Sequence, residues 1–236
     1  MKRNFLFDWY ESPRGKLLKE LEIDYLRRSI TVSCQQTILQ IGGLDWEDRF
    51  VDCSFYKNYT ILDAKCLGFH DARKIQAKSH SLPVQSGSID MIILPHLLEF
   101  DAHRFQTIRE VERILKPEGI LVILNFNPWS ISVRYQYLWN KALADSWRGH
   151  FISKSRIIDW LKLLNFEVTV SSEFKFNSVK SSYGKFAMRR HAFSTAAYGV
   201  KAIKRRYNPI PLTPVEVTAP KLVLASSVNV AGYNNG

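Results

Sequence analysis

Three short segments of the sequence carry residue types suited to holding a nucleoside. Gly42 and Gly43 directly follow an apolar run, and without side chains they would let a ligand approach the backbone. Asp63 ends the next apolar run, where a carboxylate can accept hydrogen bonds from both hydroxyls of a ribose. Ser81 and Leu82 lie in a loop that offers an apolar lip to a flat adenine ring. Alone, a double glycine is more often a plain turn and an aspartate more often a cap, but their order and spacing together predict a nucleoside pocket.

The elements that must position these residues follow from the apolar pattern. Short apolar runs typical of buried strands lie at 37–41, 59–62, 89–94, 120–124, 166–170 and 196–203. Apolar residues three or four apart predict helices over 12–28, 103–115 and 156–164. This alternation indicates an α/β sheet with helices on both faces. In such a sheet ligands collect beyond the carboxyl ends of the strands, where the glycine pair and the aspartate stand.

Composition narrows the class of protein. The chain has 236 residues, 46% of them hydrophobic and 13% aromatic, so it can bury a core and is not a disordered chain. Its N-terminus lacks the apolar stretch of a signal peptide, and no apolar run reaches the roughly 18 residues needed to cross a bilayer. The three cysteines are scattered and predict neither disulfides nor a metal site. We therefore expect a cytoplasmic protein without a transmembrane segment.

Positive charge is concentrated near the C-terminus. The formal net charge is +11, and the residues from Lys180 onward hold nine Lys or Arg against one acid, Glu216. Such a region can attract nucleic acid or an anionic membrane surface. The stretch 201–206, with Arg189 and Arg190 nearby, could bind phosphates. The plainer interpretation is a strand end followed by a solvated, charged turn.

Several of these segments resemble, in order, the motifs of one protein family. The matching segments are Ile38–Gly43, Asp63, Leu82–Asp90, Ile92–Phe100 and Glu110–Gly119. They are similar to the successive motifs of type-11 S-adenosylmethionine (SAM)-dependent methyltransferase domains, which belong to class I. The segments LPHLLEF and FNPWS further resemble an uncharacterised bacterial branch of that family. The similarity runs from about Trp9 to Pro214.

The resemblance implies a fold and a division of the chain. The expected fold is a Rossmann-like, seven-stranded, mostly parallel sheet flanked by helices. Residues 1–214 would form the methyltransferase domain, and residues 215–236 would be a disordered tail. Within the domain we expect an N-terminal helix at 12–28, a SAM-binding core at 36–125, and a substrate-side lid with the C-terminal strands at 126–214.

The resemblance also implies roles for single residues. SAM would lie across Gly42, Gly43, Asp63 and the loop with Ser81 and Leu82. Leu94, Pro95 and His96, at the end of a strand, would face the methionine part and the methyl acceptor. Methyl transfer needs a base only when the acceptor must lose a proton, and His96 is the residue best placed for that. A histidine that orders the strand end through a backbone hydrogen bond is the alternative.

The sequence departs from the family pattern at the glycine loop. Gln40 stands where the family has an acid, and Leu44, Asp45 and Trp46 stand where further glycines belong. Lys78 replaces an aspartate that often binds the adenine amino group. Because SAM is a cation, losing carboxylates weakens its binding. A second hypothesis is therefore a fold that has lost catalysis and acts as a binding module.

The methyl acceptor is not encoded in any motif. Asn127 and Trp129 follow a strand and would shape the substrate mouth, with a partly aromatic lid downstream at Tyr135, Tyr137, Trp139 and Trp147. Aromatic residues at helical spacing are also typical of a core. We expect a small-molecule acceptor, with an RNA methyltransferase as the alternative that the basic C-terminal region suggests.

Overall fold

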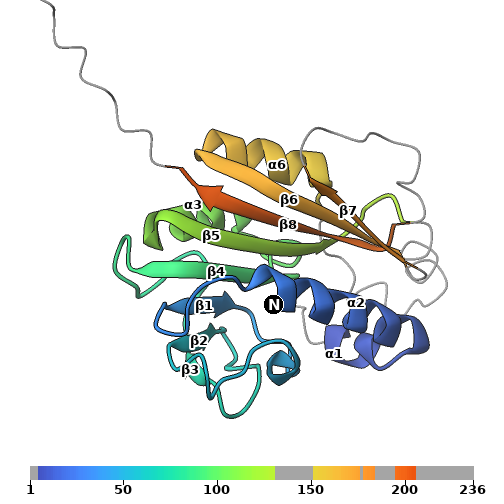
Figure 1. Cartoon of the computed structure of the whole chain (residues 1–236), viewed down its shortest axis with the longest axis horizontal. Helices are drawn as coiled ribbons and strands as arrows, with labels where there is room; N and C mark the ends of the chain where they lie inside the picture. Colours follow the sequence, from blue (N-terminus) through green and yellow to red (C-terminus); the bar gives the residue numbers. More distant parts are fainter. Residues whose placement is uncertain (1–4, 131–150, 176–177, 184–194, 206–236) are drawn as a thin grey trace, which may run out of the picture. The chain divides into compact units, whose positions relative to one another are not determined.

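The computed structural model describes residues 5–130, 151–175, 178–183 and 195–205. Its strands are β1 (Ile38–Ile41), β2 (Tyr59–Leu62), β3 (Arg73–Ile75), β4 (Ile89–Pro95), β5 (Leu115–Phe126), β6 (Phe166–Lys175), β7 (Ser178–Tyr183) and β8 (Ala197–Lys204). Its helices are α1 (Phe5–Tyr10), α2 (Pro13–Ser29), α3 (Arg104–Ile114) and α6 (Lys154–Leu163), with a short 3₁₀ turn, η1, at Glu47–Arg49. Figure 1 shows these elements along the chain.

The strands form one sheet in the order β3-β2-β1-β4-β5-β8-β6-β7. Pairing is parallel from β3 through β5, and β8 runs antiparallel to both β5 and β6. The predicted seven-stranded, mostly parallel sheet is confirmed by β1 to β6 together with β8. Strand β7 pairs antiparallel with β6 and adds an eighth strand at the edge.

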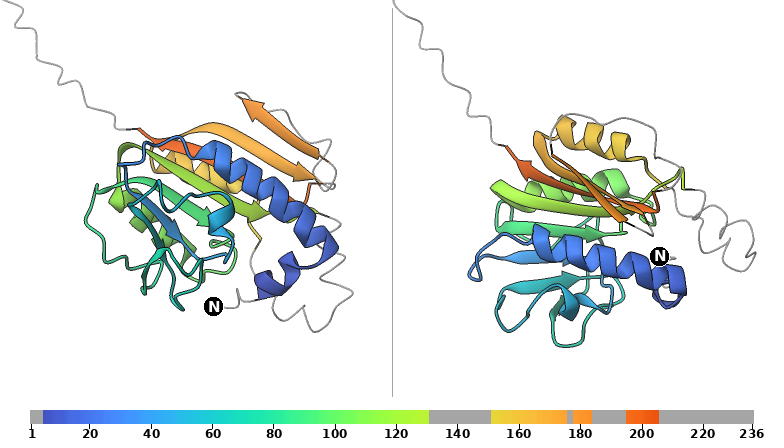
Figure 2. Two further views of the ribbon diagram at one scale, coloured as in Figure 1. Left: turned by 60° about the horizontal axis from the view of Figure 1, so that its bottom comes forward. Right: turned by 45° about the vertical axis from the view of Figure 1, so that its right-hand side comes forward.

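Each face of the sheet is covered by a separate apolar cluster. On one face α1, α2 and the chain around η1 pack through residues such as Leu18, Leu26 and Trp46. On the other face α3 and α6 pack through residues such as Val111 and Leu161. Figure 2 shows the two helical layers on opposite sides of the strands. The strand order reverses between β1 and β4, so their carboxyl ends form the edge at which a ligand is expected.

The predicted helices and strands lie close to the observed ones. The helix predicted at 12–28 begins after Ser12, whose side chain accepts a hydrogen bond from the backbone N–H of Gly15 at 3.1 Å. The helix predicted at 103–115 is observed at Arg104–Ile114, and β5 begins at the next residue. Strand β3, helix α1 and strand β7 have no counterpart among the predicted elements.

Some predictions fall on parts of the chain that the structure does not describe. They are the tail at 215–236, the aromatic residues between 131 and 150, and the basic residues Arg189, Arg190 and Arg206. All described residues belong to one unit, Met1–Arg206. Among them, no helix combines the length and apolar character that a bilayer span requires.

Candidate functional site

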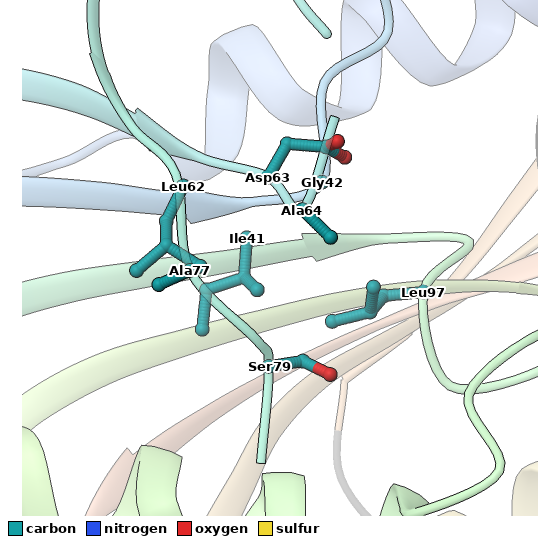
Figure 3. Close-up of a pocket in the computed structure, with 8 residues that line it drawn as sticks. All are labelled: Ile41, Gly42, Leu62, Asp63, Ala64, Ala77, Ser79 and Leu97. Carbon is teal, nitrogen blue, oxygen red and sulfur yellow. The ribbon is translucent and has the colours of Figure 1, made fainter. Parts of the chain in front are cut away.

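A hollow lies at the carboxyl ends of β1 and β2. The residues that line it come from the ends of β1 and β2 and from the segments that follow β1, β2, β3 and β4. They are Ile41, Gly42, Leu62, Asp63, Ala64, Ala77, Ser79 and Leu97. Figure 3 shows the aliphatic side chains of Ile41, Leu62 and Ala77 close together, with Leu97 across from them and the hydroxyl of Ser79 below. The empty volume is about 190 Å³, and the hollow is open to solvent. Of the residues predicted to bind the cofactor, Gly42 and Asp63 therefore share one hollow.

Asp63 is held by the backbone around it. The side chain is only 6% exposed. Its carboxylate accepts hydrogen bonds from the N–H of Lys65 at 2.7 Å and from the N–H of Gly43 at 3.4 Å. The carboxylate therefore links the two strand ends.

The turn after β1 has no room for side chains. Gly42 has a φ of 96°, in the left-handed region that favours glycine. A Cβ at Gly43 would lie 2.2 Å from the carbonyl oxygen of Leu67, so the loop after β2 packs directly on the glycine. The glycine pair thus serves two purposes: one residue turns the chain and the other admits the neighbouring loop.

A buried glutamate, which the sequence analysis missed, holds this turn in place. The carboxylate of Glu47 accepts hydrogen bonds from the N–H of Leu44 at 2.5 Å, from Nε2 of Gln40 at 2.7 Å and from the N–H of Phe69 at 2.9 Å. Burial raises the pKa of Glu47, and these hydrogen bonds oppose that rise. Tyr59 completes the network by donating from its hydroxyl to Oε1 of Gln40 at 2.7 Å.

This network explains why the glycine loop departs from the family pattern. Gln40 in β1 is fully buried and bonds the glutamate that lies seven positions later. Leu44 and Trp46 are buried in the cluster on the α1–α2 face, and Asp45 accepts a hydrogen bond from the N–H of Gly68 at 3.0 Å. Leu44 and Trp46 therefore pack into the core, Asp45 is exposed and bonds the neighbouring loop, and none of the three lines the hollow.

The structure places the other predicted cofactor residues outside the hollow. Leu82 is buried in the cluster under α3, and its backbone bonds Oε2 of Glu110 and the guanidinium of Arg113. Ser81 is exposed, and Leu94 and Pro95 are buried in β4. Ala77 and Ser79 line the hollow instead, and they lie in the same connection between β3 and β4 as Ser81 and Leu82. The residues of this loop that line the hollow thus lie nearer its start than the predicted Ser81 and Leu82, because hydrogen bonds fix Leu82 to α3.

His96 lies inside a buried charged network. Its Nε2 is 2.9 Å from Oε1 of Glu22 in α2, and its Nδ1 is 3.6 Å from Oε2 of Glu99; all three side chains are fully buried. Tyr10 donates to the other oxygen of Glu22 at 2.6 Å, and the N–H of Phe126 donates to Glu99. Burial alone would lower the pKa of His96, but the two carboxylates outweigh it and raise the pKa to about 9.

This placement does not suit the predicted base. A general base must come within hydrogen-bonding reach of the substrate proton, and the ring of His96 has no exposed surface. Its backbone N–H also donates to the carbonyl of Leu124 at 2.9 Å. The geometry therefore agrees with the alternative in which the histidine orders the end of β4, although its main partners are carboxylates rather than the backbone.

The predicted substrate-side residues lie beyond β5. The amide of Asn127 donates to the carbonyl of Thr195 at 3.0 Å and accepts from the N–H of Trp129 at 3.2 Å. Trp129 is 52% exposed. Asn127 therefore shapes the turn, and the indole of Trp129 is the side chain that the turn presents to solvent.

The described basic residues near the C-terminus contact the rest of the fold. Lys201 donates to the carbonyl of Ser29 and to the hydroxyl of Thr31, both at 3.0 Å. Lys204 pairs with Glu112 at 2.8 Å, and Arg205 pairs with Glu167 at 2.6 Å and with Glu118. Because these cations already bond carbonyl, hydroxyl and carboxylate groups of the fold, they are less suited to bind phosphate groups.

Comparison with known proteins agrees with this architecture. Residues 31–123 match the family model described as a methyltransferase domain. The chain is 26% identical over 208 residues to the uncharacterised protein YafS of Escherichia coli (strain K12), covering 88% of this chain and 84% of that one.

Solved structures share the fold at low sequence identity. A SAM-dependent methyltransferase from Archaeoglobus fulgidus has a TM-score of 0.61 and 16% identity, with 84% of this chain and 99% of that chain covered. The geranyl diphosphate C-methyltransferase from Streptomyces coelicolor A3(2), solved with S-adenosyl-L-homocysteine, has a TM-score of 0.56 and 11% identity, with 82% and 85% covered. The fold is the class I methyltransferase fold.

Proposed function

We propose, from the premise that residues 31–123 are a SAM-dependent methyltransferase domain, that this chain transfers the methyl group of SAM to a small-molecule acceptor. The observation that carries the proposal is the meeting of Gly42 and Asp63 in one hollow at the reversal of strand order. This is the edge at which open α/β sheets bind nucleotides.

The chemistry of the hollow fits the adenosyl end of the cofactor. Asp63 offers a carboxylate to the ribose hydroxyls, and apolar side chains such as Leu62, Ala77 and Leu97 offer a surface to the adenine. We therefore assign the hollow to the nucleoside and place the methionine end beyond it, toward β4.

Little further chemistry is required of the protein. SAM supplies a methyl group that is already activated by the sulfonium charge. The residues of this chain have to bind the nucleoside, align the acceptor with the methyl group and exclude water. The exposed indole of Trp129, at the end of β5, is a surface on which a planar acceptor can stack. No side chain is assigned the role of general base.

The direct test is calorimetry with SAM and with S-adenosylhomocysteine. We expect Asp63→Ala to weaken both ligands at least roughly tenfold, since charge-assisted hydrogen bonds contribute about 1.5–3 kcal/mol. Asp63→Asn, which keeps the shape of the side chain, should weaken binding as well. Asp71→Ala serves as the matched control, because Asp71 is an exposed aspartate in the same connection between β2 and β3. Unchanged affinity in Asp63→Ala would mean that the ribose lies elsewhere.

The packing around Leu44 and Trp46 favours one other candidate function. Because these side chains belong to the core and Glu47 fixes the turn, the chain could keep the fold as a binding module without catalysis. Folded protein that gives no heat with millimolar SAM or S-adenosylhomocysteine would favour this second function. Binding of either ligand would favour the methyltransferase.

A further inference from the structure

Helices α3 and α6 carry three large apolar side chains beside one another, of which Phe105 and Leu163 are exposed and Trp160 is half-buried. Phe105 in α3 is 60% exposed, and its ring contacts that of Trp160 in α6 at a centroid distance of 4.5 Å. Leu163, one turn after Trp160, is 81% exposed, the highest value among the exposed large hydrophobic residues of the described chain. The two helices cover the same face of the sheet, and Trp160 packs partly against the cluster beneath them while Phe105 and Leu163 are exposed.

Arginines flank the apolar side chains at helical spacing. Arg109 lies four residues after Phe105, and Arg156 lies four residues before Trp160, so each shares a helix face with one of the two contacting aromatic rings. Both arginines are exposed. We call the five residues Phe105, Arg109, Arg156, Trp160 and Leu163 the α3–α6 patch.

The charge of the α3–α6 patch remains positive when its neighbours are included. Glu112, one turn after Arg109, is paired with Lys204 at 2.8 Å. Asp159 is an exposed acid on α6, beside Lys162 and Arg156. The two exposed arginines of the α3–α6 patch therefore outnumber the one exposed acid beside them.

We propose that the α3–α6 patch docks this protein onto the surface of an anionic lipid bilayer. Aromatic rings and a leucine on one helical layer can enter the boundary between head groups and acyl chains. Arginines keep their charge at head-group level while their stems follow the apolar surface. Basic residues near an anionic bilayer are attracted to it. The protein would then lie on the membrane without spanning it.

The patch fits a bilayer better than it fits another macromolecule. A single-stranded nucleic acid would stack its bases on aromatic rings, but the most exposed side chain here is Leu163, which has no aromatic face. A stable dimer buries about 800 Å² on each partner. Three partly exposed side chains supply less than roughly 500 Å², since a large aromatic residue buries about 150–250 Å² in full. A bilayer needs neither a large area nor stacking.

The α3–α6 patch begins at the same edge of the sheet as the proposed site. Phe105 lies in the first turn of α3, which begins shortly after the carboxyl end of β4. The patch therefore starts on the side of the sheet where the strands β1, β2 and β4 end. The docking itself does not depend on the proposed methyl transfer, and it can be measured without any cofactor.

The test is co-sedimentation of the full chain with vesicles. One set contains phosphatidylcholine alone, and the other contains about one third phosphatidylglycerol. We expect binding to the anionic vesicles that weakens as salt is raised, and little binding to the neutral ones. Leu163→Glu should reduce partitioning at least roughly tenfold. Arg109→Gln and Arg156→Gln should each reduce it roughly fivefold.

Matched controls come from helix α2 on the opposite face. Leu17 is a 52% exposed leucine, and Arg14 is an exposed arginine. Leu17→Glu and Arg14→Gln should leave vesicle binding unchanged. The proposal is overturned if the wild-type chain does not bind anionic vesicles, or if Leu17→Glu and Leu163→Glu weaken binding equally. It is also overturned if the patch variants weaken binding to a single-stranded oligonucleotide, or change the oligomeric state, without affecting vesicles.

Discussion

The ends of β1 and β4 are neighbours in the sheet, yet buried glutamates hold them in different ways. At β1, Glu47 receives hydrogen bonds from three neutral donors, two of them backbone N–H groups. At β4, His96 carries a raised pKa between Glu22 and Glu99. Within the described chain, Nδ1 of His96 and Oε2 of Glu99 have no hydrogen-bond partner.

The ends of β1 and β4 are therefore stabilised by different kinds of interaction. Neutral donors satisfy both oxygens of Glu47 without a second charge, so hydrogen bonds alone hold this carboxylate in the turn after β1. The end of β4 depends on an ion pair in the interior, where removal of one partner leaves the other charge uncompensated. The nucleoside half of the proposed site should therefore tolerate changes of charge and pH better than the half next to it.

The same substitution at the two glutamates should have unequal effects. We expect Glu22→Gln to lower the free energy of unfolding by about 3–5 kcal/mol, because it removes the counterion of a buried histidine. Glu47→Gln should lower it by only about 1–2 kcal/mol, because the amide still accepts one of the hydrogen bonds. Urea unfolding of both variants measures the difference. Equal losses would contradict the distinction between the two networks.

Alkaline pH should weaken the β4 network. Against burial, which would lower it, Glu22 and Glu99 raise the pKa of His96 from 6.5 to about 9. A raised pKa stabilises the fold fully below the unfolded value of 6.5, and this contribution is lost as the pH rises through about 9. The contribution is up to about 3 kcal/mol. Unfolding free energies at about pH 6 and about pH 10 should show the loss in the wild type. His96→Gln should remove most of the difference, and a variant that keeps the full pH dependence would refute the assignment.

A further effect is expected at the turn after β1, where Gly43 contacts the loop after β2. Gly43→Ala places a Cβ where it would lie 2.2 Å from the carbonyl oxygen of Leu67, so the loop after β2 has to move. Overpacking of this kind costs about 1–3 kcal/mol. Thermal unfolding measures the cost, and calorimetry with S-adenosylhomocysteine then shows whether the displaced loop changes cofactor affinity. Unchanged stability would show that the contact between Gly43 and Leu67 does not fix the turn.

Periodicity predicted the parts of the fold that bury a regular apolar pattern. The strand predicted at 59–62 is observed at Tyr59–Leu62, and the helix predicted at 156–164 is observed at Lys154–Leu163. Strand β3 was missed because Arg73 and Lys74 are exposed and only Ile75 is apolar. Strand β3 is therefore defined by its pairing with β2 rather than by burial. Strand β7, with the sequence SVKSSY, has neither alternation nor an apolar run.

The site was predictable where single residues determine it and not where contacts between distant residues do. Gly42 and Asp63 could be found from their place after strands, and the structure brings them into one hollow. Glu47 gave no signal, because a glutamate seven positions after Gln40 matches no motif. The burial of His96 depends on Glu22, 74 residues away in the chain, which no local pattern reveals.

The position of β8 has a consequence for how the chain assembles during synthesis. This strand is the last one described, yet in the sheet it lies between β5 and β6. Until residues 197–204 have left the ribosome, β5 and β6 each present an open edge with unpaired backbone groups. The nascent chain therefore has to keep both edges from pairing with other chains until its final strand arrives, and truncation before Ala197 should yield an aggregating product.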